Sequence, residues 1–228
     1  MILERKMQMN VPDLKQQDGY IESSGVENMR SSIVEFAGLF HLYNSAMKEV
    51  STKLEILDDE FHIRHSYNPI HHLECRIKSL RSIHDKLLKR GAALSIDSVR
   101  EYVNDIAGIR VICNFVDDIY LTEKLLLRQA DITLLKRKDY IASPKENGYR
   151  SLHLVVEVPV FLSDKTENVP VEIQMRTVAM DYWASLEHML RYKNSVDMQE
   201  HSGNLLHCAN VLAETERTMQ EIRNSIER

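Results

Sequence analysis

This sequence is poor in cysteine and has no long apolar run. Its three cysteines, Cys75, Cys113 and Cys208, are odd in number and far apart. That spacing argues against a disulfide framework and suits a reducing cytoplasm. No apolar stretch approaches the roughly 20 residues that cross a membrane, and the N-terminus lacks the apolar segment of a signal peptide. We therefore expect a cytoplasmic protein without a membrane partner.

Glycine-rich phosphate loops are also missing. The chain has 7 glycines, and none of them belongs to a GxxxxGK[ST] or GxGxxG motif. The formal net charge is −5, which makes the chain a poor partner for duplex nucleic acid. Any phosphate site must therefore be built from locally clustered side chains.

Enough apolar residues are present for a core with appended helices. They make up 43% of the 228 residues, which suits one domain of ordinary size. Residues 1–23 are polar and contain Pro12 and Gly19, so we expect a flexible arm. In residues 24–65, apolar positions alternate in steps of three and four, which predicts a long helix with a narrow apolar seam: Val26, Met29, Ile33, Phe36, Phe40, Tyr43, Met47, Val50 and Leu54. The pattern leaves open whether the seam packs against its own domain or contacts another subunit.

Two further helices are predicted before the first strand. One runs from Pro69, which suits a first helical turn, to Gly91, which suits a C-terminal cap. Its buried stripe would consist of Ile70, Leu73, Ile77, Leu80, Ile83 and Leu87. The other lies within residues 92–105, with Ser95 or Asp97 as its N-cap.

The rest of the chain alternates strands and helices. The predicted strands are "IRVICNF", "ITLLKRKDYI", and a hairpin of "LHLVVEVPVFL" and "VPVEIQMR" across the turn "SDKTENVP". The predicted helices are "DDIYLTEKLLLRQ", capped by Asp117 or Asp118, "TVAMDYWASLEHMLRYK", with Trp183 in the core, and a final helix within 194–228. This order predicts an α+β fold with a mixed sheet between helical ends.

Basic residues form two clusters in this acidic chain. The first, in residues 76–90, consists of Arg76, Lys78, Arg81, Lys86, Lys89 and Arg90 against Asp85 alone. The second, in residues 136–150, consists of Lys136, Arg137, Lys138, Lys145 and Arg150 against Asp139 and Glu146. Each cluster alone could be a solvated face, but together they indicate a compact polyanion such as nucleotide phosphates. Tyr149 lies in the second cluster and could stack on a base.

Strand alternation gathers polar side chains on one face. In the strand "VPVEIQMR", Glu172, Gln174 and Arg176 point to the same side, which is either solvent or a site. Asp105 lies at the end of a predicted helix, just before "IAGIRVIC", where it could be a cap or loop residue. If the two strands are neighbours, Asp105 and Glu172 could share a Mg²⁺ ion, which uses one or two carboxylates together with substrate phosphates.

Four segments together resemble the RelA/SpoT-type (p)ppGpp synthetase domain. They are "RIKSLRSIHDKLLKRG", "YVNDIAGIRVIC", "KRKDYIASPKENGYRSLHL" and "VEIQMRTVAMDYWASLEH", in the family's order, and the resemblance covers residues 66–193. The short chain and helical flanks are similar to the small alarmone synthetases, in particular the RelP type. The resemblance implies a nucleotidyltransferase-like fold and a closed homotetramer. It also implies transfer of pyrophosphate from ATP to the 3′-hydroxyl of GDP or GTP, with release of AMP.

The resemblance also implies roles for single residues. Asp105 and Glu172 would hold Mg²⁺, and Glu172 would help to deprotonate the 3′-hydroxyl. On the ATP side, Arg76 and Arg110 would flank the adenine while the phosphates would meet Lys78, Lys86 and Lys89. On the GDP or GTP side, Tyr149 would stack on guanine, and the remaining contacts would come from Lys138, Lys145, Asn147, His153, Gln174 and Arg176. Such a transfer depends on positioning and charge neutralisation more than on covalent chemistry.

One departure and one alternative accompany the resemblance. The family's R-x-K-D motif reads Lys136-Arg137-Lys138-Asp139 here. Lysine keeps the charge of arginine but loses its bidentate geometry, which leaves the preference between GDP and GTP open. The alternative function is a non-catalytic nucleotide- or RNA-binding regulator on the same fold.

Two other patterns are weaker. His84-Asp85 spells the HD pair of the hydrolase domain in long family members, but the chain has no segment long enough for that domain. A histidine-rich patch could be a zinc site or a set of surface and packing residues: His62, His65, His71, His72 and Cys75.

Overall fold

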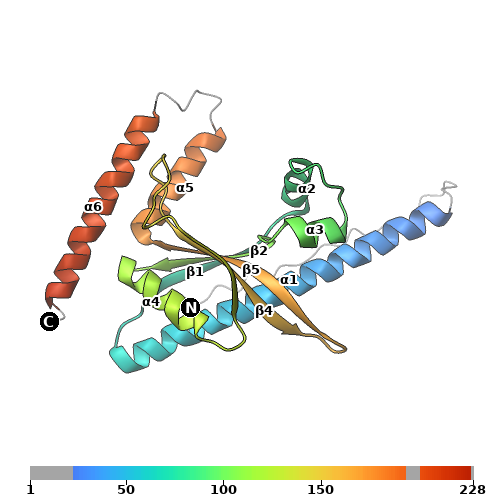
Figure 1. Cartoon of the computed structure of the whole chain (residues 1–228), viewed down its shortest axis with the longest axis horizontal. Coiled ribbons are helices and arrows are strands. Elements are labelled where there is room, and N and C mark those ends of the chain that lie inside the picture. The colour runs from blue at the N-terminus through green and yellow to red at the C-terminus, as the bar shows by residue number, and fades with distance from the viewer. Residues whose placement is uncertain (1–22, 194–200, 227–228) are drawn as a thin grey trace.

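The computed structural model describes residues 23–193 and 201–226, with side chains from residue 34 to 190 and from 201 to 226. This part of the chain forms a 5-stranded mixed sheet with helices around it (Figure 1). The strands are β1 (Ile70–Ile77), β2 (Ala107–Cys113), β3 (Thr133–Asp139), β4 (Leu152–Phe161) and β5 (Thr166–Thr177), in the order β1-β2-β5-β4-β3. Only β2 and β5 pair in parallel. The predicted α+β class is confirmed, whereas the arm expected for residues 1–23 lies outside the described residues except at its last position.

The helices frame this sheet. They are α1 (Ser23–His65), α2 (Leu80–Leu88), α3 (Ile96–Tyr102), α4 (Val116–Leu127), α5 (Val178–Lys193) and α6 (Ser202–Ile226). The long helices predicted near both ends are therefore present. Within the described ranges, no helix combines the length and the apolar character needed to cross a membrane.

One face of the sheet is apolar and lies against α1. Leu152, Leu154 and Val156 of β4 are fully buried, as are Val171 and Ile173 of β5. The predicted seam of α1 packs onto this face through Tyr43, Met47, Val50 and Leu54, all buried in the same core. At these positions the seam therefore belongs to its own domain. The side chains of Val26, Met29 and Ile33 lie outside the described set.

The helix predicted from Pro69 to Gly91 is wrong in its first half. Residues Ile70–Ile77 form the edge strand β1, and α2 begins only at Leu80, with Ser79 as its N-cap. A register shift between Ile70 and His72 interrupts the ladder to β2. As a result the burial of β1 recurs at Ile70, Leu73 and Ile77, which is a helix-like spacing in an edge strand. That spacing misled the sequence interpretation.

The remaining local predictions hold with small changes. Ser95, one of the two predicted candidates, is the N-cap of α3. The N-cap of α4 is Phe115 and not an aspartate, because Asp118 lies in the first turn and its carboxylate accepts the Phe115 N–H at 3.0 Å. β4 and β5 form the predicted hairpin, but β5 begins at Thr166, so the turn is shorter than expected.

Candidate active site

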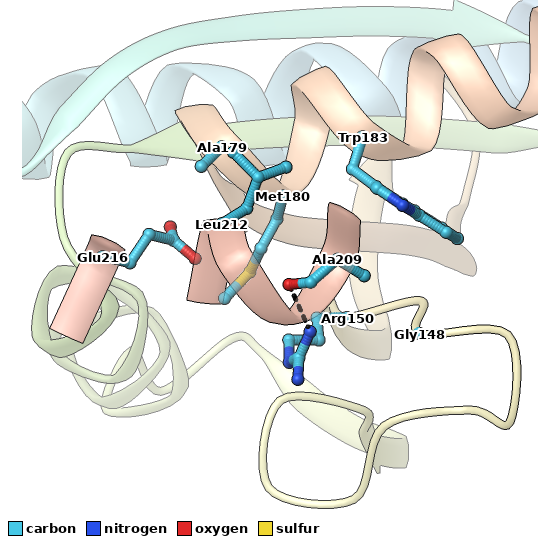
Figure 2. Close-up of a pocket in the computed structure, with 8 residues that line it drawn as sticks. All are labelled: Gly148, Arg150, Ala179, Met180, Trp183, Ala209, Leu212 and Glu216. Carbon is cyan, nitrogen blue, oxygen red and sulfur yellow. Dashed lines mark hydrogen bonds between the residues drawn. The ribbon is translucent and has the colours of Figure 1, made fainter. Parts of the chain in front are cut away.

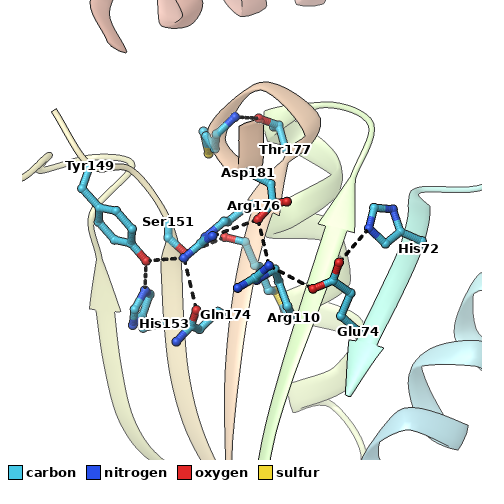
Figure 3. Close-up of polar contacts among 12 residues, drawn as sticks. His72, Glu74, Arg110, Tyr149, Ser151, His153, Gln174, Arg176, Thr177 and Asp181 are labelled. Atoms are coloured by element: carbon cyan, nitrogen blue, oxygen red, sulfur yellow. Dashed lines mark hydrogen bonds and ion pairs between the residues drawn. The ribbon is translucent and has the colours of Figure 1, made fainter. Parts of the chain in front are cut away.

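A row of polar side chains crosses the face of the sheet opposite α1. In register it runs through Glu74, Arg110, Gln174, His153 and Lys138, one residue from each strand. Figure 3 shows Glu74, Arg110, Gln174 and His153 on this face. The predicted polar face of β5 is therefore part of a site that spans the whole sheet.

The carboxylate of Asp105 lies between two lysines at one end of this face. Lys78, just after β1, donates to Oδ2 at 2.7 Å, and Lys86, on α2, donates to Oδ1 at 2.8 Å. Burial alone would raise the pKa of Asp105, but the two lysines outweigh it and lower the pKa. The predicted basic cluster thus meets a carboxylate that stays ionised.

Glu172 lies beside Asp105 on the neighbouring strand. It pairs in register with Gly108 of β2, two residues into the strand that follows Asp105. Burial raises the pKa of Glu172 and the charge of Asp105 adds to the increase, while a 3.0 Å hydrogen bond from Gln174 opposes it. The two predicted carboxylates therefore come from neighbouring segments, and the charge of one acts on the other.

This donor set fits Mg²⁺ better than zinc. In the described part of the chain no group of three or more histidine, cysteine or carboxylate side chains could hold a metal ion. One or two carboxylates are what Mg²⁺ uses when substrate phosphates complete its coordination, and here they are Glu172 on β5 and Asp105 just before β2. The possible zinc patch is not assembled, since His62 and His65 end α1 while His71, His72 and Cys75 are exposed on β1.

Arg176 organises the centre of the site. Its side chain is buried and donates to Tyr149 Oη at 2.8 Å, Gln174 Oε1 at 3.2 Å and Asp181 Oδ1 at 2.9 Å (Figure 3). Because Asp181 also lies 3.4 Å from Arg110 Nη1, one carboxylate touches both arginines. Arg110 in turn donates to Glu74 at 2.9 Å.

His153 is a neutral member of this network. Its Nε2 lies 2.8 Å from Tyr149 Oη, and its Nδ1 lies 4.0 Å from Glu172 Oε1. Burial lowers the pKa of His153 to about 4, with help from the positive charges of Arg176, Lys145 and Lys138. The ring therefore bonds to tyrosine without carrying charge near neutral pH.

The turn of residues 145–150 presents aromatic rings and cations together. Lys145 Nζ lies 4.7 Å from the centre of the Tyr140 ring and 4.6 Å from that of Tyr149. Asn147 fixes the turn, because its Oδ1 accepts the Tyr149 N–H at 3.2 Å and its Nδ2 donates to Glu187 at 3.4 Å. Lys138 lies 5.9 Å from the Tyr140 ring centre.

The C-terminal helix braces the same turn. Figure 2 shows a pocket where Gly148 and Arg150 meet residues of α5 and α6. Arg150 donates to Ala209 O at 2.9 Å, and Gly148 has φ +90 with no room for a Cβ atom, which would lie 2.6 Å from Ala209 Cβ. Trp183 is buried here rather than in the main core, and its indole donates to Leu205 O at 2.9 Å.

Some predicted site residues lie at the margin. Arg76 on β1 and Lys89 at the end of α2 are exposed. Arg137, in the variant basic motif, turns away from the site and pairs with Glu123 of α4 at 2.6 Å. His84 and Asp85 are exposed on α2, so the HD dipeptide is a surface feature.

The sequence relationships agree with this geometry. A region found in RelA / SpoT proteins matches residues 75–197. The chain belongs to the RelA/SpoT family. A relative in this family, GTP pyrophosphokinase YwaC from Bacillus subtilis (strain 168), is 41% identical over 173 residues, covering 76% of this chain and 82% of that protein. GTP pyrophosphokinase YjbM from the same organism is 36% identical over 186 residues, covering 81% and 87%.

Solved structures in the RelA/SpoT family share the fold. Small alarmone synthetase 2 from Bacillus subtilis is 38% identical and superposes with a TM-score of 0.76 over 84% of this chain and 99% of that one. Small alarmone synthetase 1, bound to its product pppGpp, is 32% identical with a TM-score of 0.77 over 85% and 99%. These likenesses confirm the predicted nucleotidyltransferase-like fold and the small alarmone synthetase resemblance.

Three residues of this RelA/SpoT site escaped sequence reasoning. Asp181 bridges two arginines, Glu74 pairs with Arg110, and Tyr140 stacks beside Lys145. Asp181 could have been suspected, because a carboxylate in the first turn of a helix lies close to the strand that leads into it. Glu74 could not, because its stretch was interpreted as a helix.

Proposed function

We infer that this chain is a GTP pyrophosphokinase. It transfers the pyrophosphoryl group of ATP to the 3′-hydroxyl of GDP or GTP and produces ppGpp or pppGpp with AMP. The observation that carries this proposal is that Asp105 is near enough for its charge to raise the pKa of Glu172, while Lys78 and Lys86 bind Asp105. The turn that carries Tyr149 lies on the same face of the sheet, within reach of that pair through His153.

The donor nucleotide would lie over β1, β2 and α2. Lys78 and Lys86 bring two positive charges to the one carboxylate of Asp105. The excess positive charge can neutralise phosphate oxygens held beside it. Exposed Lys89 would extend this contact along the phosphates, and Arg76 and Arg110 would flank the adenine. Asp105 and Glu172 would hold Mg²⁺, which would neutralise charge on the transferred group.

The acceptor nucleotide would lie over β3, β4 and the turn of residues 145–150. Tyr149 would stack on guanine, while Lys138 and Lys145 would meet the phosphates. Asn147, His153, Gln174 and Arg176 would fix the acceptor site, because their contacts hold the Tyr149 ring and the polar row.

Glu172 would accept the proton of the 3′-hydroxyl. Burial raises the pKa of this carboxyl, so its ionised form is a stronger base than an exposed glutamate. The neutral ring of His153 can hydrogen bond without competing for that proton. The chain therefore supplies positioning, charge neutralisation and a base, which are the requirements of this transfer.

The test of function is a product analysis. The purified chain is incubated with ATP, GDP and Mg²⁺, and the nucleotides are separated by anion exchange. We expect ppGpp and AMP in equal amounts. ADP with free phosphate would overturn the reaction class, and nucleotide binding without turnover would favour the non-catalytic regulator.

We further propose a cytoplasmic homotetramer that acts in the bacterial stringent response. ATP and GTP are cytoplasmic substrates, and an alarmone product serves regulation during stress. No duplex nucleic acid is proposed as a partner, given the net charge of −5.

A further inference from the structure

One carboxylate joins the two halves of the site. Asp181 Oδ1 lies 2.9 Å from Arg176 Nη1 and 3.4 Å from Arg110 Nη1. Arg110 is on β2 and Arg176 on β5, and these strands are direct neighbours. Figure 3 shows Asp181 between the two guanidinium groups.

The position of Asp181 is fixed by the start of α5. Thr177 ends β5 and its Oγ1 accepts the Met180 N–H at 3.2 Å, which holds the first turn in which Asp181 lies. The Asp181 side chain is 19% exposed and that of Arg176 is 7% exposed. Because water screens such a pair only weakly, the carboxylate charge bears directly on both arginines.

The two arginines differ in what else they contact. Arg110 has a second carboxylate partner, Glu74, at 2.9 Å, which is shorter than its contact with Asp181. Arg176 donates otherwise to neutral acceptors, Tyr149 Oη and Gln174 Oε1. Arg110 can therefore move towards a donor nucleotide without losing all of its negative partners, whereas Arg176 depends on Asp181.

We propose that Asp181 is a positioning residue that couples the ATP and GDP or GTP sites through these two arginines. This inference rests on the roles proposed above for Arg110 and Tyr149. When ATP draws Arg110 away, the whole charge of Asp181 falls on Arg176, which holds the Tyr149 hydroxyl. Binding of ATP thus strengthens the acceptor site, and linkage requires that the acceptor strengthens ATP binding by the same factor.

The coupling factor is measured by titration calorimetry. The non-hydrolysable analogue AMPCPP is titrated into the chain with Mg²⁺, without GDP and with saturating GDP. For the unchanged chain we expect GDP to tighten AMPCPP binding roughly fivefold or more. Asp181→Asn keeps the shape but removes the charge, so the factor should fall towards one.

A matched control removes the same charge elsewhere. Asp164→Asn changes an exposed aspartate in the hairpin turn at the far end of β4 and β5 and should leave the coupling factor unchanged. Asp181→Glu keeps the charge on a longer side chain and should give an intermediate factor, and it carries the test if Asp181→Asn unfolds. A merely structural role would lower the affinity for AMPCPP equally with and without GDP, and the coupling factor would stay unchanged.

The possible outcomes are distinct. If the unchanged chain binds both nucleotides and forms ppGpp but its coupling factor is one, the inference fails and the proposed function stands. The same holds if Asp181→Asn retains the full factor. If the unchanged chain binds neither nucleotide, the proposed function itself fails.

Discussion

At the scale of single residues, Glu172 is the proposed base, and its ionised form lowers the stability of the folded chain. Burial raises the pKa of its carboxyl, so ionisation at neutral pH is less favourable in the folded chain than in the unfolded one. A raised folded pKa means that the contribution to stability is present at low pH and is lost as pH rises through that pKa. A partly buried carboxylate with this cost is best explained by the reaction.

We predict that Glu172→Gln separates activity from stability. Turnover should fall at least about 10²-fold, because a base and a metal ligand are lost together. The thermal midpoint at pH 8 should be equal to or above that of the unchanged chain, since a partly buried charge is gone. Activity and calorimetric unfolding check both parts, and retention of more than about a tenth of the activity would contradict the assigned role.

His153 gives a pH-dependent prediction. Its pKa falls from 6.5 to about 4 in the folded chain, so the unfolded chain binds more protons at this site between those pH values. Stability should therefore rise with pH across this window and be lost as pH falls through it. His153→Gln should flatten the slope, as measured by urea unfolding from pH 4 to 7. An unchanged slope would show that other groups cause the acid sensitivity.

Tyr149 has a ring and a hydroxyl with different tasks. Tyr149→Ala should weaken GDP binding by roughly 1–3 kcal/mol, because the stack on the base is lost. ATP binding should be affected less. Tyr149→Phe keeps the ring but loses the contacts with Arg176 and His153, so its effect on GDP should be smaller. Equal losses for ATP and GDP in the alanine variant would indicate that the ring only shapes the turn.

At the scale of elements, period-two patterns were reliable guides and the edge strand was not. Buried and partly exposed positions alternate along β4 as far as Val160 and along β5 from Val169 to Met175, so the faces of these segments could be assigned from sequence. β1 lies at the edge of the sheet with an irregular register, and its three inward residues recur at a helical spacing. Its true conformation follows from pairing with β2, which is non-local.

The same contrast applies to the site. The sequence could suggest that Asp105 and Glu172 meet only on the condition that the two strands are neighbours, and the parallel pairing of β2 with β5 fulfils that condition. The Asp181 bridge depends on the angle at which α5 leaves β5, and on side chains from two strands. The bracing of the 145–150 turn by α6 depends on a contact between distant segments, Arg150 and Ala209. A local pattern could place Asp181 near the end of β5, but it could predict neither the bridge to two arginines nor the contact with α6.

The contact between this turn and α6 can be tested at Gly148. Gly148→Ala would place a Cβ atom 2.6 Å from Ala209 Cβ and force a side chain into φ +90. We expect a lower thermal midpoint and weaker GDP binding, with ATP binding nearly unchanged. Gly203→Ala is the control, because a Cβ atom there, within α6, meets nothing within 4 Å. Equal behaviour of the two variants would argue against the brace.

At the scale of the whole molecule, α1 and α6 differ in what covers their apolar residues. The sheet buries α1 from Tyr43 to Leu54, and Phe40 packs against the same core. Phe40→Glu would therefore damage the core, which makes it a poor probe of assembly. On α5 and α6 a set of large apolar side chains remains exposed: Tyr182, Leu186, Met189, Leu190, Val211, Met219 and Ile222. Exposed apolar residues gathered on two adjacent helices are typical of a protein contact.

We predict that these two helices contribute to the proposed homotetramer. Light scattering should give about four times the 26.5 kDa of one chain at micromolar concentration. Met219→Glu with Ile222→Glu places charges where the side chains are 51% and 46% exposed, so each chain should still fold while the assembly falls into smaller species, since burying those charges in a contact is costly. Phe161→Glu, at a 76% exposed position on the hairpin, is the control and should keep the assembly. A monomeric mass for the unchanged chain would refute the assembly, and an intact tetramer in the double variant would move the contact away from α6.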